Sequence, residues 1–275
     1  MSTRLYRRKL PEGWYPHQKE AAEAAIGQWQ PGSLDIPVCA CIIPHAGWYF
    51  SGDIAYKVLT TISVVPDVIA VIGGHLSKHD PVLLLDYDYF ETPFGTLKTD
   101  TDLVSTLLHG ISMETFDTSD NSVEIQLPLV KNRFKDSEVV CLRVPPSKSA
   151  LQVAKIMYKY KMESNKKILI IGSTDLTHYG SNYRFIKDMD INSALAWVRD
   201  VNDHEFISAC LTFNSGKILE KGINDHAACS SGAALCAMEY ANLNDAKSTR
   251  LIAYGTSFDK HPSSSFVGYA GIVYY

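Results

Sequence analysis

Four short segments of this chain are almost continuously apolar instead of alternating between apolar and polar residues. They lie at residues 38–43, 68–72, 138–144 and 167–172. Continuous hydrophobicity is typical of strands that are covered on both faces, as in a parallel sheet. Amphipathic helices are predicted between them, for example at 52–59 and 150–161. The pattern therefore predicts an α/β fold, with a mostly parallel central sheet flanked by helices.

The other patterned segments are expected to complete this sheet. Residues 82–100 predict a strand and a hairpin, which we expect to form an antiparallel edge element. A helix is predicted at 121–130, where Pro128 should bend or shift it because proline cannot donate an intrahelical hydrogen bond. Two strands with several glycines, at 249–259 and 265–275, close the chain.

Length, composition and charge narrow the class of protein. The 275 residues are 46% hydrophobic and contain no Pro/Ser-rich linker, so we expect one domain over residues 1–275. The net charge is −4 and the basic residues are scattered, which argues against nucleic acid or a membrane surface as a partner. Without an apolar membrane-spanning run, the expected location is the cytoplasm, and small molecules, peptides or proteins are the expected partners. Six cysteines without C-x-x-C spacing do not predict disulfides.

Two histidines directly follow predicted strands. His45 comes after residues 38–43, where Pro44 should end the strand and Ser51 should cap the next helix. His75 follows residues 68–72 through two glycines. Ligands bind at the carboxyl ends of strands in α/β sheets, so we expect His45 to face a cleft, and a second parallel strand also ends in a histidine. The alternative for His45 is a hydrogen-bonded structural histidine.

Two further segments carry candidate chemistry. Asp175 and His178 lie three residues apart just beyond the strand at 167–172, where the histidine can act as acid or base and the aspartate can orient it or bind substrate. A capping Asp with a surface His is the alternative. Cys229 precedes a helix, so it is either a metal ligand, a nucleophile or a small buried residue. Glu124 lies among apolar residues and is either a paired structural carboxylate or a functional one.

Four sequence blocks together resemble a known family. They are Pro44-His45-Ala46-Gly47-Trp48-Tyr49-Phe50-Ser51-Gly52, Glu124-Ile125-Gln126-Leu127-Pro128, Ser173-Thr174-Asp175-Leu176-Thr177-His178-Tyr179-Gly180 and Val267-Gly268-Tyr269-Ala270. In this order they resemble the Memo family, whose prokaryotic members are called AmmeMemoRadiSam system protein B. That family resembles the class III (LigB-like) extradiol dioxygenases in fold, in which strand ends of an α/β sheet hold a mononuclear iron site.

The resemblance implies a metal site and assigns its residues. His45, His75 and Cys229 become the metal ligands, and Asp175 and His178 line the same pocket, with His178 as the acid and base. Cys229 stands where the dioxygenases would supply a carboxylate. Two histidines and a thiolate suit iron or copper, with zinc possible as well.

The chain departs from the family pattern at three places. The Gly73-Gly74-His75 loop is expected to be one residue shorter than usual, which would displace His75 and make His79 an alternative ligand. Asp120-Asn121 stands where many members have Glu-His, so a pocket imidazole is lost. Ser230 replaces the glycine after the cysteine.

Three hypotheses for function follow. The first is a dioxygenase-like, metal-dependent oxidoreductase. The second is a non-catalytic binding protein that uses the same cleft, since the resemblance extends to eukaryotic Memo, an adaptor in cell-motility signalling. The third is a hydrolase or transferase with Cys229 as nucleophile, His178 as base and Asp175 as its orienting partner.

Overall fold

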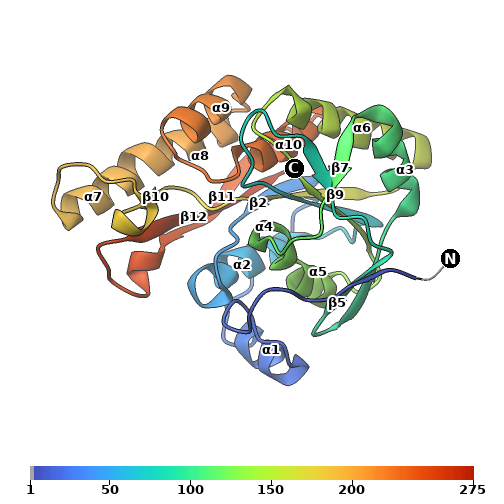
Figure 1. Ribbon diagram of the computed structural model, residues 1–275, viewed down its shortest axis with the longest axis horizontal. Coiled ribbons are helices and arrows are strands. Elements are labelled where there is room, and N and C mark those ends of the chain that lie inside the picture. Colours follow the sequence, from blue (N-terminus) through green and yellow to red (C-terminus); the bar gives the residue numbers. More distant parts are fainter. Residues whose placement is uncertain (1–2) are drawn as a thin grey trace.

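A nine-stranded mixed sheet forms the centre of the computed structural model, which describes residues 3–275 (Figure 1). Its strands are β2 (Ala40–Ile43), β3 (Val68–Gly73), β4 (Val82–Leu84), β7 (Met113–Thr115), β8 (Glu138–Arg143), β9 (Ile168–Ser173), β10 (His178–Tyr179), β11 (Thr249–Thr256) and β12 (Phe266–Tyr274). The order is β10-β12-β2-β9-β3-β8-β4-β7, and β11 pairs with β12. The central strands β2, β9, β3 and β8 are parallel, while β12 and β4 run antiparallel on either side of them.

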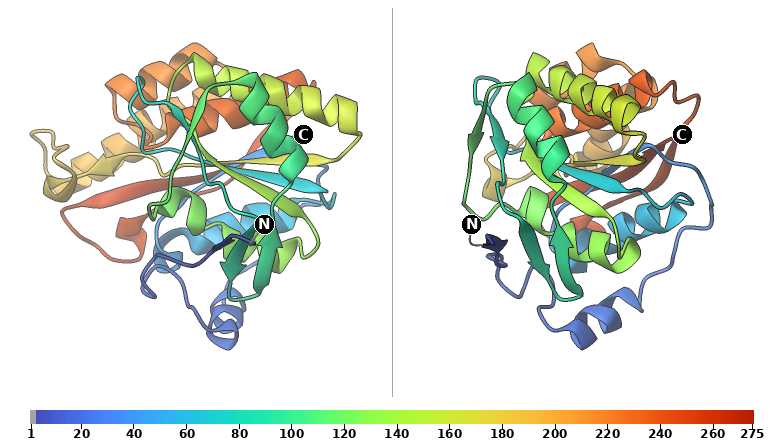
Figure 2. Two further views of the ribbon diagram at one scale, coloured as in Figure 1. Left: turned by 45° about the vertical axis from the view of Figure 1, so that its right-hand side comes forward. Right: turned by 90° about the vertical axis from the view of Figure 1, so that its right-hand side faces the viewer.

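Helices cover both faces of this sheet (Figures 1 and 2). One face carries α1 (Lys19–Ile26), α2 (Asp53–Thr61), α4 (Asn121–Glu124) and α5 (Leu127–Arg133). The other carries α3 (Thr101–Gly110), α6 (Lys148–Ser164), α8 (Asp203–Leu211), α9 (Ser215–Asn224) and α10 (Ser231–Leu243), and α7 (Ile191–Trp197) lies toward the β10 end. Across residues 3–275, none of these helices has both the length and the apolar composition needed to cross a membrane.

Each central strand contributes to two hydrophobic cores. In β3, Ala70 and Ile72 pack into the core beneath α6 and α10, whereas Ile69 and Val71 pack into the core beneath α2 and α5. Successive side chains of a strand point to opposite faces, so a strand covered on both faces needs apolar residues at every position. This explains the continuous apolar runs and confirms the predicted α/β sheet flanked by helices.

The segment at 82–100 differs in part from its prediction. Strand β4 does pair antiparallel with β8, as expected of an antiparallel element near the sheet edge. The hairpin of β5 (Tyr89–Thr92) and β6 (Gly95–Lys98) instead leaves the main sheet and pairs with β1 (Leu5–Tyr6) in a separate three-stranded sheet. The prediction was wrong here because β5 pairs with a segment more than eighty residues away, and a local sequence pattern does not indicate so distant a pairing.

Pro128 divides the predicted helix at 121–130 into two. Helix α4 ends at Glu124, and α5 begins at Leu127 with the proline in its first turn, where its missing N–H costs no hydrogen bond. The expected bend or shift is confirmed. Ser51, in contrast, does not cap α2: it lies in a π-helical turn at Trp48–Gly52 and donates to the carbonyl of Ala46, 3.2 Å away.

Glu124 holds the N-terminal segment against the domain. Its side chain is 2% exposed and accepts hydrogen bonds from the hydroxyls of Tyr6 and Tyr15 and from the backbone N–H groups of Lys9 and Leu10, at 2.9–3.1 Å. Several donors compensate the cost of burying the carboxylate. Of the two alternatives for Glu124, its contacts support the structural one.

Candidate metal centre

His45 lies just beyond the end of β2 and is fully buried, with 1% of its surface exposed. Its backbone N–H donates to Oδ1 of Asp175 at 2.6 Å, and its carbonyl accepts from Nδ2 of Asn121 at 3.1 Å. The ring atom Nδ1 lies 3.3 Å from the hydroxyl of Ser173, at the end of the neighbouring strand β9. These contacts fix the backbone and one side of the ring, so the other nitrogen, Nε2, faces the remaining site residues.

His75 reaches the same place from the end of β3 through a tight turn. Its backbone is left-handed, with φ 57°, which is uncommon for a residue other than glycine and is often found at functional sites. A Cβ on the preceding Gly74 would lie 2.4 Å from the side chain of Ser230, so only glycine fits there. Nδ1 of His75 donates to the carboxylate of Asp120 at 3.3 Å.

Cys229 lies two residues before α10 and is attached to the end of β9. Its backbone N–H donates to the carbonyl of Asp175 at 3.2 Å, while the next N–H, of Ser230, donates to the hydroxyl of Thr174 at 3.0 Å. The N-terminus of a helix favours nearby negative charge, here a thiolate. The cysteine is therefore positioned by the strand end and the helix start together.

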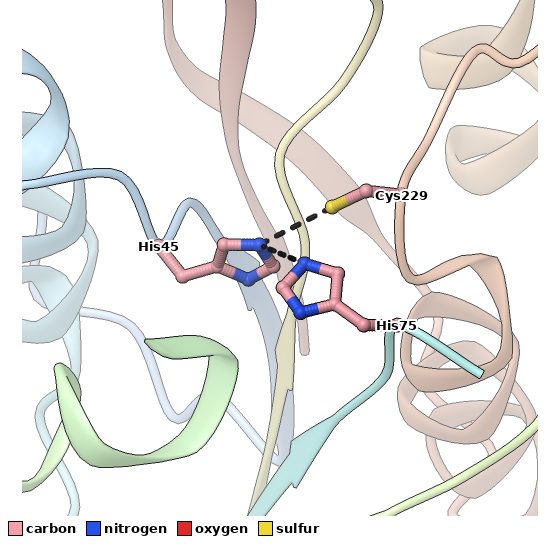
Figure 3. A group of neighbouring side chains, drawn as sticks. All are labelled: His45, His75 and Cys229. Carbon is pink, nitrogen blue, oxygen red and sulfur yellow. Dashed lines mark hydrogen bonds between the residues drawn. The ribbon is translucent and has the colours of Figure 1, made fainter. Parts of the chain in front are cut away.

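The three side chains converge (Figure 3). Nε2 of His45 lies 3.1 Å from Nε2 of His75 and 3.2 Å from Sγ of Cys229, and one ligand atom from each residue lies within 4.8 Å of the others. The imidazole rings meet edge to face with their centroids 4.8 Å apart. We call these three residues the triad. His79, the alternative ligand, is exposed and is not part of it.

The triad is strongly coupled electrostatically. Burial by itself would raise the pKa of the Cys229 thiol, but the neighbouring imidazoles of His45 and His75 hold that pKa well below its usual value. Burial opposes protonation of His75, yet the carboxylate of Asp120 and the thiolate of Cys229 raise its pKa to about 10. The pKa of Asp120 is correspondingly lowered to about 2, against the effect of its burial, chiefly by His75. The triad therefore contains a thiolate and protons that a bound metal cation would displace.

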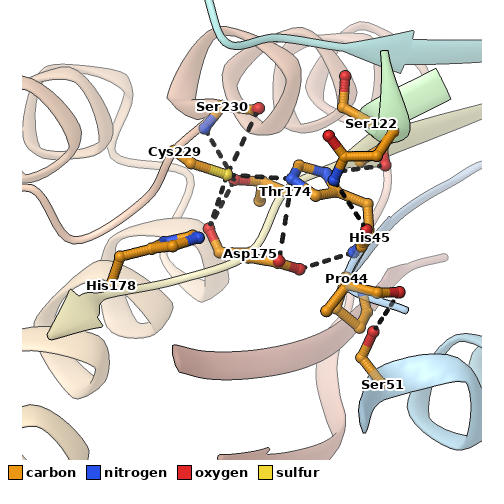
Figure 4. Close-up of polar contacts among 12 residues, drawn as sticks. Pro44, His45, Ser51, Ser122, Thr174, Asp175, His178, Cys229 and Ser230 are labelled. Atoms are coloured by element: carbon orange, nitrogen blue, oxygen red, sulfur yellow. Dashed lines mark hydrogen bonds and ion pairs between the residues drawn. The ribbon is translucent and has the colours of Figure 1, made fainter. Parts of the chain in front are cut away.

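Asp175 and His178 lie beside the triad but do not form the predicted pair (Figure 4). Asp175 is 3% exposed and contacts His45: its Oδ1 accepts from the backbone N–H, and its Oδ2 lies 3.9 Å from Nε2. Burial raises the pKa of Asp175. Nδ1 of His178 instead donates to the carbonyl of Leu176 at 3.0 Å. The carboxylate thus orients His45 rather than His178.

A cleft of about 780 Å³, here called the main cleft, opens onto the triad. His45, His75, Asp175 and His178 form part of its wall, so the structure brings all but one of the predicted site residues to this cleft. The remaining predicted residue, Cys229, borders a neighbouring cavity. Aromatic side chains form much of the rest of the main cleft, among them Trp14, Tyr49, Phe50, Tyr183 and Tyr269.

Residues that the sequence analysis did not assign support the triad from behind. Asp120 binds His75 and also lies 3.3 Å from the guanidinium of Arg143, and Asn121 binds the carbonyl of His45. Gln126 donates from Nε2 to the carbonyl of Pro44 at 2.8 Å and to the hydroxyl of Ser173 at 2.9 Å. The sequence did mark Asp120 and Asn121, because they differ from the Glu-His of many family members. It did not show that they contact His75 and His45, because those contacts depend on the fold.

Comparison with known proteins places the chain in a family. The family model described as Memo-like protein matches residues 11–273. This chain belongs to the Memo-like family. A MEMO1 family protein of Archaeoglobus fulgidus is 28% identical over 273 residues, which cover 97% of this chain and 98% of the relative. A MEMO1 family protein of Methanococcoides burtonii is 28% identical over 243 residues, 86% of each chain.

Among solved structures, an uncharacterized protein from Escherichia coli K12 aligns with a TM-score of 0.46 and 13% identity. The alignment covers 84% of this chain and 98% of that protein. A TM-score and an identity this low do not support a family assignment, which rests on the sequence matches alone. The Memo resemblance seen in the sequence is thereby confirmed, whereas the relationship to extradiol dioxygenases stays a prediction.

Proposed function

We propose that this Memo-like protein is an oxidoreductase that uses iron or copper held by the triad. The convergence of two imidazole nitrogens and one thiolate sulfur beside a large cleft is the observation that supports this most. The site has two features of a redox centre: a ligand set that includes a soft sulfur, and space beside it for a substrate.

The donor atoms fit a single metal ion. Bonds of about 2.0–2.3 Å from a tetrahedral metal to nitrogen and sulfur put neighbouring ligand atoms roughly 3.3–3.7 Å apart. The separations of 3.1 and 3.2 Å about Nε2 of His45 are close to this, and small side-chain rotations would suffice to reach it. Three protein ligands leave a position open for a substrate, as in catalytic rather than structural sites. Asp120 supports the ligand His75 through its other ring nitrogen, an arrangement common at metal sites.

Bound iron or copper would supply redox chemistry that protein side chains lack. The proposed role of His178 is proton transfer. Since the carbonyl of Leu176 can only accept, Nδ1 of His178 carries a hydrogen in this arrangement, and Nε2 of the neutral ring has a free lone pair. That nitrogen can take a proton from a molecule in the main cleft and return it later.

Metal analysis of full-length, untagged protein tests this proposal. Plasma mass spectrometry should find close to one iron or copper per chain in the wild type, after purification without chelator or after anaerobic reconstitution. His45→Ala and Cys229→Ala should lose the metal, while His79→Ala, which removes an exposed histidine outside the triad, should retain it. Folded wild-type protein that binds neither metal under anaerobic conditions would overturn the proposal. If the wild type does bind iron or copper, oxygen consumption by the metal-loaded protein would be measured next.

A second candidate function is peptide binding in the main cleft. The observation in its favour is the set of aromatic side chains that line this cleft. One of them, Tyr49, is 64% exposed. Exposed aromatic side chains are common at binding surfaces. This candidate predicts a peptide ligand whose affinity is the same in wild type and in the metal-free Cys229→Ala variant.

The cysteine-hydrolase hypothesis has less support. A nucleophile needs its base within hydrogen-bond reach, and the base needs an orienting group. Nε2 of His45 lies 3.2 Å from Sγ of Cys229, whereas the hydrogen bond made by His178, the expected base, goes to the carbonyl of Leu176.

A further inference from the structure

A second cavity reaches the triad beside the main cleft. It has a volume of about 350 Å³, and we call it the side cavity. Its wall includes His75, His178, Tyr183, Arg184, His226 and Cys229. His75, His178 and Tyr183 border both cavities, whereas His45 and Asp175 line the main cleft and Cys229 lines the side cavity. The triad is therefore open to two adjoining spaces of different size.

The two spaces also differ in charge. Arg184 is the one lysine or arginine among the residues that line them, and it belongs to the side cavity. Within residues 3–275, its guanidinium takes part in none of the ion pairs or hydrogen bonds of the structure. An arginine without an internal partner at the wall of a cavity is suited to bind an anion from solution.

We propose that the side cavity binds a small carboxylate beside Sγ of Cys229, with Arg184 as its counter-ion. One guanidinium matches the single charge and planar shape of a carboxylate, and its fork geometry allows two parallel hydrogen bonds. The volume is at the lower end of the range for small-molecule pockets, while the larger aromatic-lined main cleft takes a bulkier substrate. The use of this carboxylate as a second reactant rests on the proposed oxidoreductase function, whereas its binding does not.

Selective alkylation of Cys229 tests the binding. Iodoacetate carries a carboxylate and iodoacetamide is its neutral analogue, and both react when the thiolate displaces iodide and forms a carbon–sulfur bond. The ratio of their rates at Cys229, read by peptide mass spectrometry in the same full-length preparation, cancels differences in thiolate content and metal occupancy. Arg184→Gln should lower this ratio three- to tenfold, and Arg184→Lys should lower it less.

Lys187→Gln is the matched control. It removes the same charge from the same loop, but Lys187 packs over the ring of Trp197, 4.0 Å from the ring centroid, instead of lining the side cavity. Its ratio should equal that of the wild type. Acetate at constant ionic strength should slow the iodoacetate reaction saturably. An unchanged ratio in Arg184→Gln would overturn the proposal, and stronger protection by inorganic phosphate than by acetate would overturn the assignment to a carboxylate. Neither result depends on whether the triad binds metal.

Discussion

The Nε2 atoms of His45 and His75 lie 3.1 Å apart, although the two residues follow strands that are not neighbours in the sheet. Strand β9 lies between β2 and β3, and its last residue, Ser173, contacts the ring of His45. The histidines thus meet across the end of the intervening strand. Such a meeting requires each ring to be held on its other side, and the hydroxyl of Ser173 does so for His45 and the carboxylate of Asp120 for His75.

Loss of the Asp120 carboxylate should weaken metal binding. Asp120→Asn keeps the shape of the side chain but removes the negative charge that accepts from Nδ1 of His75. Partners of this kind typically contribute 10–100-fold in metal affinity, so we expect a weakening of about this size in a competition titration with a chromogenic chelator. Asp117→Asn is the control, because Asp117 lies close by in the chain but contacts Lys9 and Tyr87 instead of His75. Equal affinities in both variants would contradict this role.

In metal-free protein, the rate of alkylation of Cys229 by iodoacetamide should reach its plateau at a lower pH than that of an ordinary thiol. The imidazoles of His45 and His75 hold the pKa of this thiol well below its usual value, so the thiolate, which is the reactive form, is present at lower pH. Burial raises the pKa of Cys39, the other partly exposed cysteine, to about 11, so its rate should rise about tenfold per pH unit. His75→Ala should move the plateau of Cys229 to higher pH. Stopped reactions analysed by peptide mass spectrometry give both rates, and parallel profiles for the two cysteines would refute the expectation.

Glu124→Ala should destabilise the fold by about 3 kcal/mol or more. The change leaves the hydroxyls of Tyr6 and Tyr15 and two backbone N–H groups without their acceptor, and each buried unpaired donor costs roughly 1–3 kcal/mol. Urea unfolding followed by circular dichroism measures the loss. Glu12→Ala, an exposed position in the same N-terminal segment, should change the free energy of unfolding by less than about 0.5 kcal/mol.

Asp203→Asn should change how stability depends on pH. Asp203 is completely buried behind the His178 turn, where it accepts from the N–H of Thr177 at 3.0 Å and from the hydroxyl of Tyr254 at 2.8 Å. Burial raises its pKa from 3.8 to about 6, despite these hydrogen bonds. Between those two values the folded state binds a proton that the unfolded state has lost. The contribution of Asp203 to stability is therefore full below pH 4 and is lost as the pH rises through 6.

The asparagine does not titrate, so the free energy of unfolding of the variant, relative to that of the wild type, should rise by about 2.5 kcal/mol between pH 4 and pH 7. Urea unfolding at both pH values gives this double difference. The same measurement on Asp200→Asn, a surface carboxylate close by in the chain, should give a value near zero. A double difference near zero for Asp203→Asn as well would show that its carboxylate is not held in the protonated form.

The central sheet and the strand ends that carry the site could be predicted from the sequence. Apolar runs reveal buried strands because both faces of such a strand must be covered, and Pro128 reveals a helix boundary because proline lacks the N–H of a helix interior. These are local consequences of side-chain chemistry. The positions of His45, His75 and Cys229 near one another followed from the family resemblance, and the structure brings their ligand atoms together.

The partners of those residues were decided only by the tertiary structure. Asp175 is expected from the sequence to orient His178, three residues away, or to bind substrate, but its carboxylate accepts from His45, which is 130 residues distant in sequence. The hairpin of β5 and β6 pairs with β1, and Arg184 shares a cavity with Cys229. Sequence determines where a strand ends and which chemical groups stand there, because those features depend on neighbours along the chain. Which group meets which depends on strand order and on packing between distant segments, and local patterns do not encode either.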